Sequence, residues 1–319
     1  MLAHAAIQAL HFSPLLAEQK DREGYIVQKE WEQLKAQIEE LYRQGQYREL
    51  VPLMERAVRL AGKLYGLGSL TYAAMLNDYG GVRRDIGNYQ QAEEAYLEAK
   101  ELLLALTGEK DLNYGNTLNN LAGLYRLMGQ RDKAESMFLQ ALALYRELLG
   151  EEDFLTVSGL NNLGLLYQDM GKYDQAEALH RQSLALIRRG DDTEIAYATT
   201  LNNLASALRA QEKLADAGPL LAEALDIYER ALGREHSLYA YGLNNLAAYY
   251  FTISSFEQAA ECYYQSLASC RKLFGTHSRN YVVSLRNLAT TLERLGRKDE
   301  ADRLQSEAQE IMQALGEVK

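Results

Sequence analysis

The sequence predicts an all-α fold, a solenoid of about seven helix-turn-helix units. Three observations predict it. A motif of the form Leu-Asn-Asn-Leu returns about every 42 residues, a glycine interrupts five of the seven units near their middle, and a second glycine closes each unit. Self-similarity at such a period is typical of supersecondary units that bury their apolar faces against their neighbours, because no single unit can bury its own.

The motif appears six times, and consecutive copies begin 41 or 42 residues apart. Four copies read Leu-Asn-Asn-Leu, the first reads Leu-Asn-Asp-Tyr and the last reads Leu-Arg-Asn-Leu. The copies begin at Leu76, Leu118, Leu160, Leu201, Leu243 and Leu285. This regularity over 319 residues predicts one elongated domain, since the core of a repeat array grows along one dimension.

The third unit shows how one copy is built. Its first segment places Leu118 and Leu121 at helical spacing, and its second segment starts the pattern again with Ala134 and Phe138. Between them, Gly129 supplies a residue that enters positive φ without steric cost, as a tight turn requires. The unit is therefore predicted to be helix, turn and helix.

The same positions return along the chain and define the units in order. The turn position holds Gly45, Gly87, Gly129, Gly171, Glu212, Ser254 and Gly296; the small residue of the second helix is Ala92, Ala134, Ala176, Ala217, Ala259 and Ala301; and the closing glycines are Gly66, Gly108, Gly150, Gly190, Gly233, Gly275 and Gly316. They predict repeats at about 28–69, 70–111, 112–154, 155–191, 192–236, 237–278 and 279–316, within a repeat region of 25–316. Residues 1–24 are predicted to be a lead-in helix or a flexible segment, and residues 317–319 a tail.

Charge and hydropathy argue against nucleic acid and membranes as partners, and the two cysteines argue against a disulfide between them. The net charge is -10 and the pI is near 5.2, whereas duplex nucleic acid and anionic membranes call for a basic surface. No stretch approaches the run of about 20 apolar residues that a membrane helix needs. The two cysteines, Cys262 and Cys270, lie roughly 12 Å apart on one predicted helix and cannot form a disulfide with each other. We therefore expect a cytoplasmic protein that binds neither nucleic acid nor membrane.

The sequence contains no recognisable catalytic or metal-binding arrangement. None of the five histidines has metal-ligand spacing to other histidines, cysteines or acidic residues, and no phosphate-binding loop or nucleophile motif occurs. We therefore expect no enzyme activity, no metal and no cofactor. His180 shares the position of Tyr96 and Phe138 and is predicted to be a packed ring, whereas His236 is predicted to cap a helix or assist stacking.

These repeated positions resemble the tetratricopeptide repeat, whose pattern is W-x2-L-G-x2-Y followed by A-x3-F. The segment from Leu160 to Tyr167 reads L-x2-L-G-x2-Y, and Ala134 and Phe138 supply A-x3-F. The period and the L-N-N-L-A signature are similar to repeats of the kinesin light chain type, and the resemblance covers about residues 28–316. Bacterial chains carry such repeats in many contexts, and no heptad coiled coil precedes these repeats. Both points favour a bacterial repeat protein rather than a motor subunit.

The resemblance implies a right-handed superhelix whose first helices line an inner groove that holds an extended peptide or a partner helix. In the family, the second polar residue of the motif points into the groove; here that position holds Asp78, Asn120, Asn162, Asn203, Asn245 and Asn287. An amide side chain can pair with the backbone of an extended ligand whatever its sequence. Alternatively, one amide of each pair bonds to the neighbouring repeat and fixes the stacking, and both uses can coexist in one side chain.

Three arginines share a position six residues after the groove amide: Arg84, Arg126 and Arg209. A guanidinium pairs with a carboxylate at two points, so these are the strongest candidate anchors for a ligand. Most acidic residues lie on the second helices and linkers, which predicts a neutral to mildly basic inner face on an acidic body. The sequence thus favours a protein or peptide partner that is polar or acidic.

Three functions remain compatible with these observations. The first is a non-catalytic scaffold or adaptor that holds an extended segment of a partner protein. The second is a peptide-gated regulatory receptor of the bacterial signalling type, in which a short peptide tightens the superhelix. The third is an assembly subunit of a neighbouring enzyme.

Overall fold

The computed structural model describes residues 14–44, 47–187, 193–276 and 278–314. Within these ranges the chain forms fourteen α-helices and no strand. The helices are α1 (Pro14–Gln44), α2 (Tyr47–Tyr65), α3 (Leu70–Asp85), α4 (Tyr89–Thr107), α5 (Leu112–Leu127), α6 (Arg131–Leu149), α7 (Phe154–Asp169), α8 (Tyr173–Leu186), α9 (Glu194–Ala210), α10 (Leu214–Leu232), α11 (Ser237–Thr252), α12 (Phe256–Phe274), α13 (Arg279–Arg294) and α14 (Lys298–Ala314). The all-α solenoid of about seven helix-turn-helix units, predicted from the sequence, is confirmed. The predicted lead-in is helical from residue 14; residues 1–13 and the tail 317–319 lie outside the described residues.

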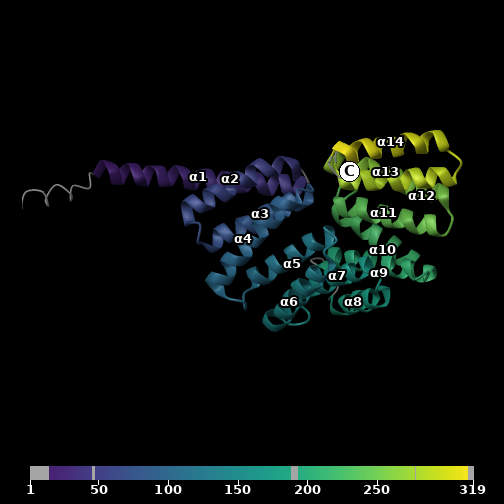
Figure 1. Ribbon diagram of the computed structural model, residues 1–319, viewed down its shortest axis with the longest axis horizontal. Helices are drawn as coiled ribbons and strands as arrows, with labels where there is room; N and C mark the ends of the chain where they lie inside the picture. Colours follow the sequence, from purple (N-terminus) through teal and green to yellow (C-terminus); the bar gives the residue numbers. More distant parts are fainter. Residues whose placement is uncertain (1–13, 45–46, 188–192, 277, 315–319) are drawn as a thin grey trace, which may run out of the picture.

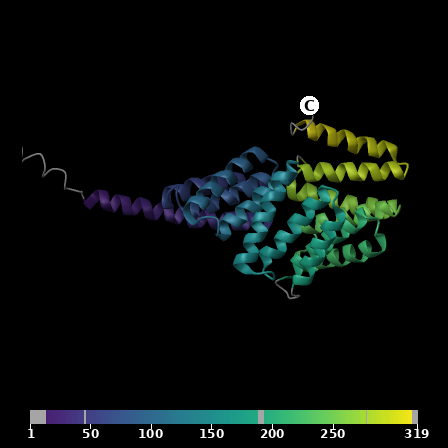
Figure 2. The ribbon, with the colours of Figure 1, turned by 60° about the horizontal axis from the view of Figure 1, so that its bottom comes forward.

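The helices pack in sequential pairs along a curve, as Figure 1 shows. Each odd-numbered helix packs on the even-numbered helix that follows it, and that helix packs on the next odd-numbered one. Successive odd-numbered helices from α3 to α11 also contact each other, whereas among the described residues no two even-numbered helices are in comparable contact. The odd-numbered helices therefore line the inner side of the curve, and the view in Figure 2 shows the same succession of pairs.

Each of the six turns within a unit that the structure describes contains one residue with positive φ. Gly87, Gly129, Gly171 and Gly296 have φ between 73° and 86°, and the units without a turn glycine place Glu212 and Ser254 at φ 61°. In each turn the chain reverses through a hydrogen bond that spans five residues, such as Gln130 N to Tyr125 O at 2.9 Å. Glycine enters this region without steric cost, so its recurrence marks the turns in the sequence. The remaining turn glycine, Gly45, lies outside the described residues, as do the closing glycines Gly190 and Gly316.

Short polar side chains cap the starts of α3, α5, α7 and α13. Ser69, Asp111, Asp153 and Ser278 each accept a hydrogen bond from a backbone N–H in the first turn of the helix that follows. His236 does the same through Nδ1, which accepts from the N–H of Leu238 at 3.1 Å. The capping role predicted for His236 is therefore confirmed, and these caps satisfy donors that a helix start leaves without an intrahelical partner.

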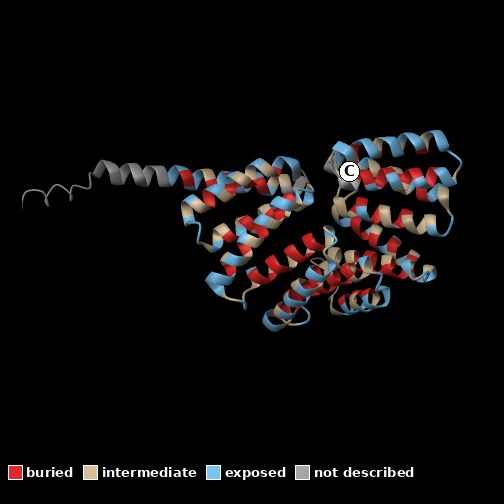
Figure 3. Ribbon diagram, viewed as in Figure 1, coloured by how far each residue is buried: buried red, intermediate tan, exposed pale blue. Residues whose placement is uncertain are grey.

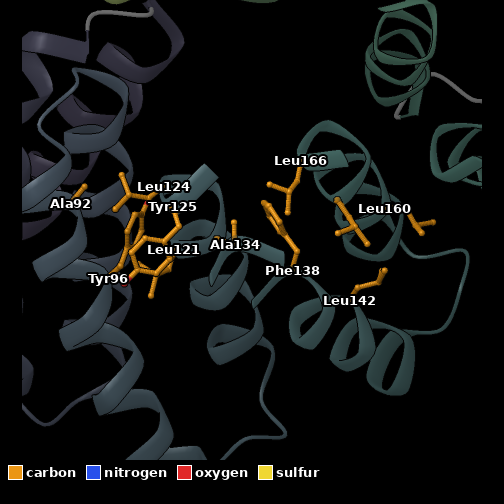
Figure 4. Packing of buried hydrophobic residues seen from close by; sticks show 12 residues of the cluster. Ala92, Tyr96, Leu121, Leu124, Tyr125, Ala134, Phe138, Leu142, Leu160 and Leu166 are labelled. Atoms are coloured by element: carbon orange, nitrogen blue, oxygen red, sulfur yellow. The ribbon is translucent and has the colours of Figure 1, made fainter. Parts of the chain in front are cut away.

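The core follows the repeated positions. The small residue of the second helix is fully buried in all six units that carry it, because side chains this short let two helices approach closely. Four residues after this alanine stand Tyr96 and Phe138, which contact leucines of the neighbouring first helix (Figure 4). Buried residues lie between the helices, and exposed residues lie on their outer sides (Figure 3).

His180 replaces this aromatic residue in the fourth unit and is completely buried. Its Nδ1 lies 2.9 Å from Asn161 Oδ1 and its Nε2 lies 2.9 Å from Gln168 Nε2. A β-carbon on Gly164 would lie 2.6 Å from the ring, so glycine is what leaves room for it. His180 is a packed ring, as predicted, and burial lowers its pKa to about 4.

The stability of the chain should depend on pH through His180. An unfolded histidine has a pKa of about 6.5, so the unfolded chain binds a proton as the pH falls through that value. In the folded chain His180 stays neutral until the pH reaches about 4. Between those values the folded state loses up to about 3 kcal/mol relative to the unfolded state. Urea unfolding at pH 7 and pH 4.5 measures the loss. His180→Phe should show a smaller loss over that range, and an equal loss in both proteins would contradict the assignment.

Candidate functional site

The polar pairs of the repeated motif form a row along α3, α5, α7, α9, α11 and α13. The even-numbered helices pack on one side of this row. The side chains of the row that are partly exposed therefore face the inside of the curve. We call this side the inner surface; it carries Asp78, Asn120, Asn162, Asn245 and Asn287. Asp78 is exposed and the four asparagines are half-buried, whereas Asn203 is only 2% exposed.

Three hydrogen bonds join amides of successive units. Asn120 Nδ2 donates to Asn77 Oδ1 at 3.1 Å, and Asn162 Nδ2 donates to Asn119 Oδ1 at 3.0 Å. In the same way, Asn287 Nδ2 donates to Asn244 Oδ1 at 3.3 Å. In each case the second amide of one motif bonds to the first amide of the preceding motif. At these three junctions the amides therefore contribute to stacking, the alternative role considered from the sequence, while the second amides stay half-buried.

The row of hydrogen bonds is interrupted at two junctions, between the fourth and fifth units and between the fifth and sixth, where Asn245 Nδ2 is buried without a partner among the described residues. Asn161 turns away from it: its Oδ1 faces His180, and its Nδ2 donates to Ser183 Oγ at 2.9 Å and to Thr200 Oγ1 at 2.7 Å. The acceptor that Asn203 would use by analogy is therefore occupied. The Oδ1 of Asn203 is buried without a partner among the described residues.

Asn202 occupies the equivalent of Asn161 but has lost the polar neighbours. Ala224 and Gly242 stand where Ser183 and Thr200 stand one unit earlier. Asn202 is fully buried, and neither of its side-chain polar atoms has a hydrogen-bond partner within the part of the chain that the structure describes. A buried amide without partners costs free energy, so this junction is a weak point of the stack.

Asp78 is the one acidic member of the row. Its side chain is exposed, yet the surrounding protein removes part of its hydration and raises the pKa of its carboxyl. A hydrogen bond with Asn77 opposes that effect but is the smaller contribution. A carboxylate that is partly desolvated at the start of the inner surface is suited to accept hydrogen bonds from a ligand.

The three predicted anchor arginines differ in their surroundings. Arg126 forms an ion pair with Asp169 at 2.7 Å across two units, and Arg84 forms one with its neighbour Asp85 at 2.9 Å. Arg209 is half-buried, and no ion pair joins it to another residue of the described ranges. Partly exposed pairs contribute only about 0–1 kcal/mol each, so a ligand carboxylate could displace the aspartates.

The pairing of Arg126 with Asp169 was missed by the sequence analysis. Asp169 follows the arginine position of its own unit by one residue, so it lies one repeat along the row from Arg126. Aligning the units would have found the pair, because equivalent positions of adjacent repeats lie side by side. The signal was present in the spacing rather than in any single motif.

Metal chemistry and membrane insertion gain no support from the geometry. The described residues contain no group of three or more histidine, cysteine or acidic side chains arranged to hold a metal ion. None of the helices, over the residues described, combines the length and the apolar character needed to span a bilayer. What the inner surface offers is a row of amides with arginines beside it.

A solenoid of helix pairs with a polar inner surface is a repeat protein of the class built by stacking helical hairpins. The family model for the tetratricopeptide repeat matches residues 40–105, 113–189, 196–270 and 242–314. The chain therefore belongs to the tetratricopeptide repeat family. Its repeats of about 42 residues and their L-N-N-L-A signature are similar to repeats of the kinesin light chain type.

Two solved structures of Rap proteins show the same fold at low sequence identity. The Rap conjugation gene regulator of the plasmid pLS20, solved in complex with the Phr* peptide, is 14% identical with a TM-score of 0.67 over 87% of this chain and 74% of that one. A Rap protein complexed with Competence and Sporulation Factor is 15% identical with a TM-score of 0.55 over 93% and 99%. Repeats from a Podosopora anserina chain described as a kinesin light chain are 22% identical with a TM-score of 0.48 over 63% and 96%. No curated protein sequence matches the chain.

The amide row allows a matched test of stacking. Asn162→Leu should lower the free energy of unfolding by about 1 kcal/mol, because it removes a hydrogen bond and leaves Asn119 Oδ1 without its donor. Asn202→Leu should leave stability unchanged or raise it, because it removes a buried amide that has no partner. Urea midpoints of the two variants measure the difference. Equal losses in both would show that the inter-unit bond contributes nothing.

Proposed function

We propose that the protein is a non-catalytic adaptor of the cytoplasm that holds an extended segment of a partner protein along its inner surface. The single observation that carries the proposal is the row of half-buried amides on α5, α7, α11 and α13, Asn120, Asn162, Asn245 and Asn287. Their partial exposure sets them apart from purely structural amides such as Asn161 and Asn202, which are buried.

The amides of the row can still form hydrogen bonds to a ligand after they have formed their inter-unit hydrogen bonds. An asparagine side chain offers two donor hydrogens and an acceptor oxygen with two lone pairs. Asn120, Asn162 and Asn287 each use one Nδ2 hydrogen in an inter-unit bond. The remaining donor and the oxygen suit the N–H and C=O groups of an extended backbone, which alternate along a strand in the same way.

The arginine position supports a polar or acidic segment as the ligand. Arg126 and Arg209 lie on the same helices as the amides, and Asp169 is a neutralising partner that a ligand carboxylate could replace. Replacing an aspartate by a ligand carboxylate costs little free energy, since the Arg126–Asp169 and Arg84–Asp85 ion pairs are both partly exposed. The structural similarity to the two Rap proteins, whose titles record a bound peptide or factor, adds support for peptide binding here.

Peptide selection tests the proposal. A displayed library of random twelve-residue peptides should yield binders of the wild-type chain. Substituting Asn120, Asn162 and Asn287 together by Ala should weaken their binding about tenfold or more, since several hydrogen bonds of about 0.5–1.5 kcal/mol each are lost. Fluorescence anisotropy measures the affinity, and circular dichroism checks that helicity is retained.

The matched control removes three amides from the second helices. Gln175, Gln182 and Gln309 are exposed on α8 and α14, so their joint substitution by Ala should leave peptide affinity unchanged. Equal affinities in the inner-surface variant and the wild type would contradict the proposal. So would equal losses in both triple variants.

A second candidate, the peptide-gated receptor, is favoured by a contact between the two ends of the curve. The guanidinium of Arg48 in α2 lies 3.9 Å from the place that a β-carbon on Gly275 would occupy, although more than 200 residues separate them. The start of α2 and the linker before α13 approach each other in Figures 1 and 2. A ligand that changes the curvature of the stack would make or break this contact.

Small-angle scattering separates the two functions. A passive adaptor should give the same mid-range profile with and without a saturating selected peptide. A receptor should shift that profile, and Arg48→Ala should shift it without peptide by releasing the end-to-end contact. We expect the unchanged profile; a shift on peptide addition would favour the receptor over the adaptor.

A further inference from the structure

A pocket of about 320 Å³ opens between α11 and α13 in the sixth and seventh units. Its lining includes the exposed Tyr241 and Val283 and the buried Ser266, Cys270 and Ser284. Tyr241 and Val283 are 41% and 49% exposed and lie four residues before Asn245 and Asn287. Residues four apart share a helix face, so the pocket opens on the inner surface.

The pocket lies at a position where two other units carry a buried tyrosine and the sixth unit carries a cysteine. Five residues before the closing glycine, the third and fifth units carry Tyr145 and Tyr228, which are 1% and 0% exposed, whereas the sixth unit carries Cys270. The Tyr228 ring lies against Gly242 of the next unit, where a β-carbon would be 3.2 Å away. Ser284 stands opposite Cys270 at the equivalent position.

In the two filled units the phenol spans the space between successive odd-numbered helices. Tyr145 Oη donates to Asn116 Oδ1 at 2.8 Å, and Tyr228 Oη donates to Thr199 Oγ1 at 3.0 Å. Asn116 and Thr199 occupy the position that Tyr241 occupies in the sixth unit. A ring that starts at the second helix therefore reaches the first helix of its own unit near the inner surface.

The chemistry of the lining favours a neutral ring. Ser266 Oγ already donates to the carbonyl of Ala240 at 3.0 Å, and Ser284 Oγ lies 3.7 Å from Cys270 Sγ. Burial raises the pKa of the Cys270 thiol, so the thiol is uncharged at neutral pH. No charged side chain lines the pocket. A charged ligand group would lose its hydration there without an ion pair, whereas an aromatic ring would replace missing packing.

From these observations we infer that the pocket receives one aromatic side chain of the bound segment. The inference rests on the proposed function, since it takes the ligand to be a peptide on the inner surface. The ring enters from the inner surface and occupies the volume that Tyr145 and Tyr228 fill from behind in their own units. This fixes the register of the segment, because the amide row alone would bind any backbone in several registers.

The first arm of the test uses p-cresol, which is the side chain of tyrosine as a free molecule. Saturation-transfer NMR should detect its binding to the wild-type chain. Binding should be lost in Cys270→Tyr, which fills the pocket as the third and fifth units do, and in Val283→Trp, which covers its mouth from an exposed position. Tyr145→Cys should add a second p-cresol site. Absence of p-cresol binding to the wild type, or its persistence in both blocking variants, overturns the inference.

The second arm uses the displayed dodecapeptide library. The wild type should select peptides with an aromatic residue at one fixed position, and Cys270→Tyr should weaken their binding at least tenfold. Changing that aromatic residue to Ala should weaken binding to the wild type but not weaken binding to Cys270→Tyr further. Peptides selected without such a residue, or bound equally by both proteins, overturn this inference alone. A wild-type chain that selects no peptide overturns the proposed function and the inference with it.

Discussion

Close approach of helices at the alanine positions is the constraint on which the rest of the structure depends. Ala92, Ala134 and Ala176 are fully buried, and each is followed four residues later by a ring that reaches the neighbouring first helix. Because the contact recurs with the period of the sequence, each unit adds nearly the same displacement, and the stack curves. The odd-numbered helices then lie on the inner side, so any polar residue on their free face belongs to one continuous surface.

That inner surface combines stacking with spare hydrogen-bonding capacity. The inter-unit bonds of Asn120, Asn162 and Asn287 hold the amides at fixed spacing, which limits the entropy that a ligand must remove on binding. The fourth and fifth units depart from the pattern, since His180 draws Asn161 into the core and Asn202 is left without partners. The middle of the array is therefore the place where the stack is least satisfied internally.

The sequence alone predicted the fold well because the repeat supplies many independent copies of each signal. The turns at Glu212 and Ser254 were placed by register although neither residue is a glycine. The partners of the amides could not be predicted, because Asn161 and Asn162 both bond across units and their side-chain rotamers decide which partner each one reaches, Thr200 or Asn119. The pocket at Cys270 was within reach of the sequence, since aligning the units sets that cysteine beside Tyr145 and Tyr228. That the candidate site residues together bind a ligand remains a proposal.

Hydrogen exchange of the full chain with and without a library-selected peptide tests the central claim most directly. If an extended segment lies along the inner surface, saturating peptide should slow exchange in α5, α7, α9, α11 and α13, and leave the even-numbered helices nearly unchanged. Protection confined to α4, α6, α8 and α10, or spread evenly over both sets of helices, would contradict the account.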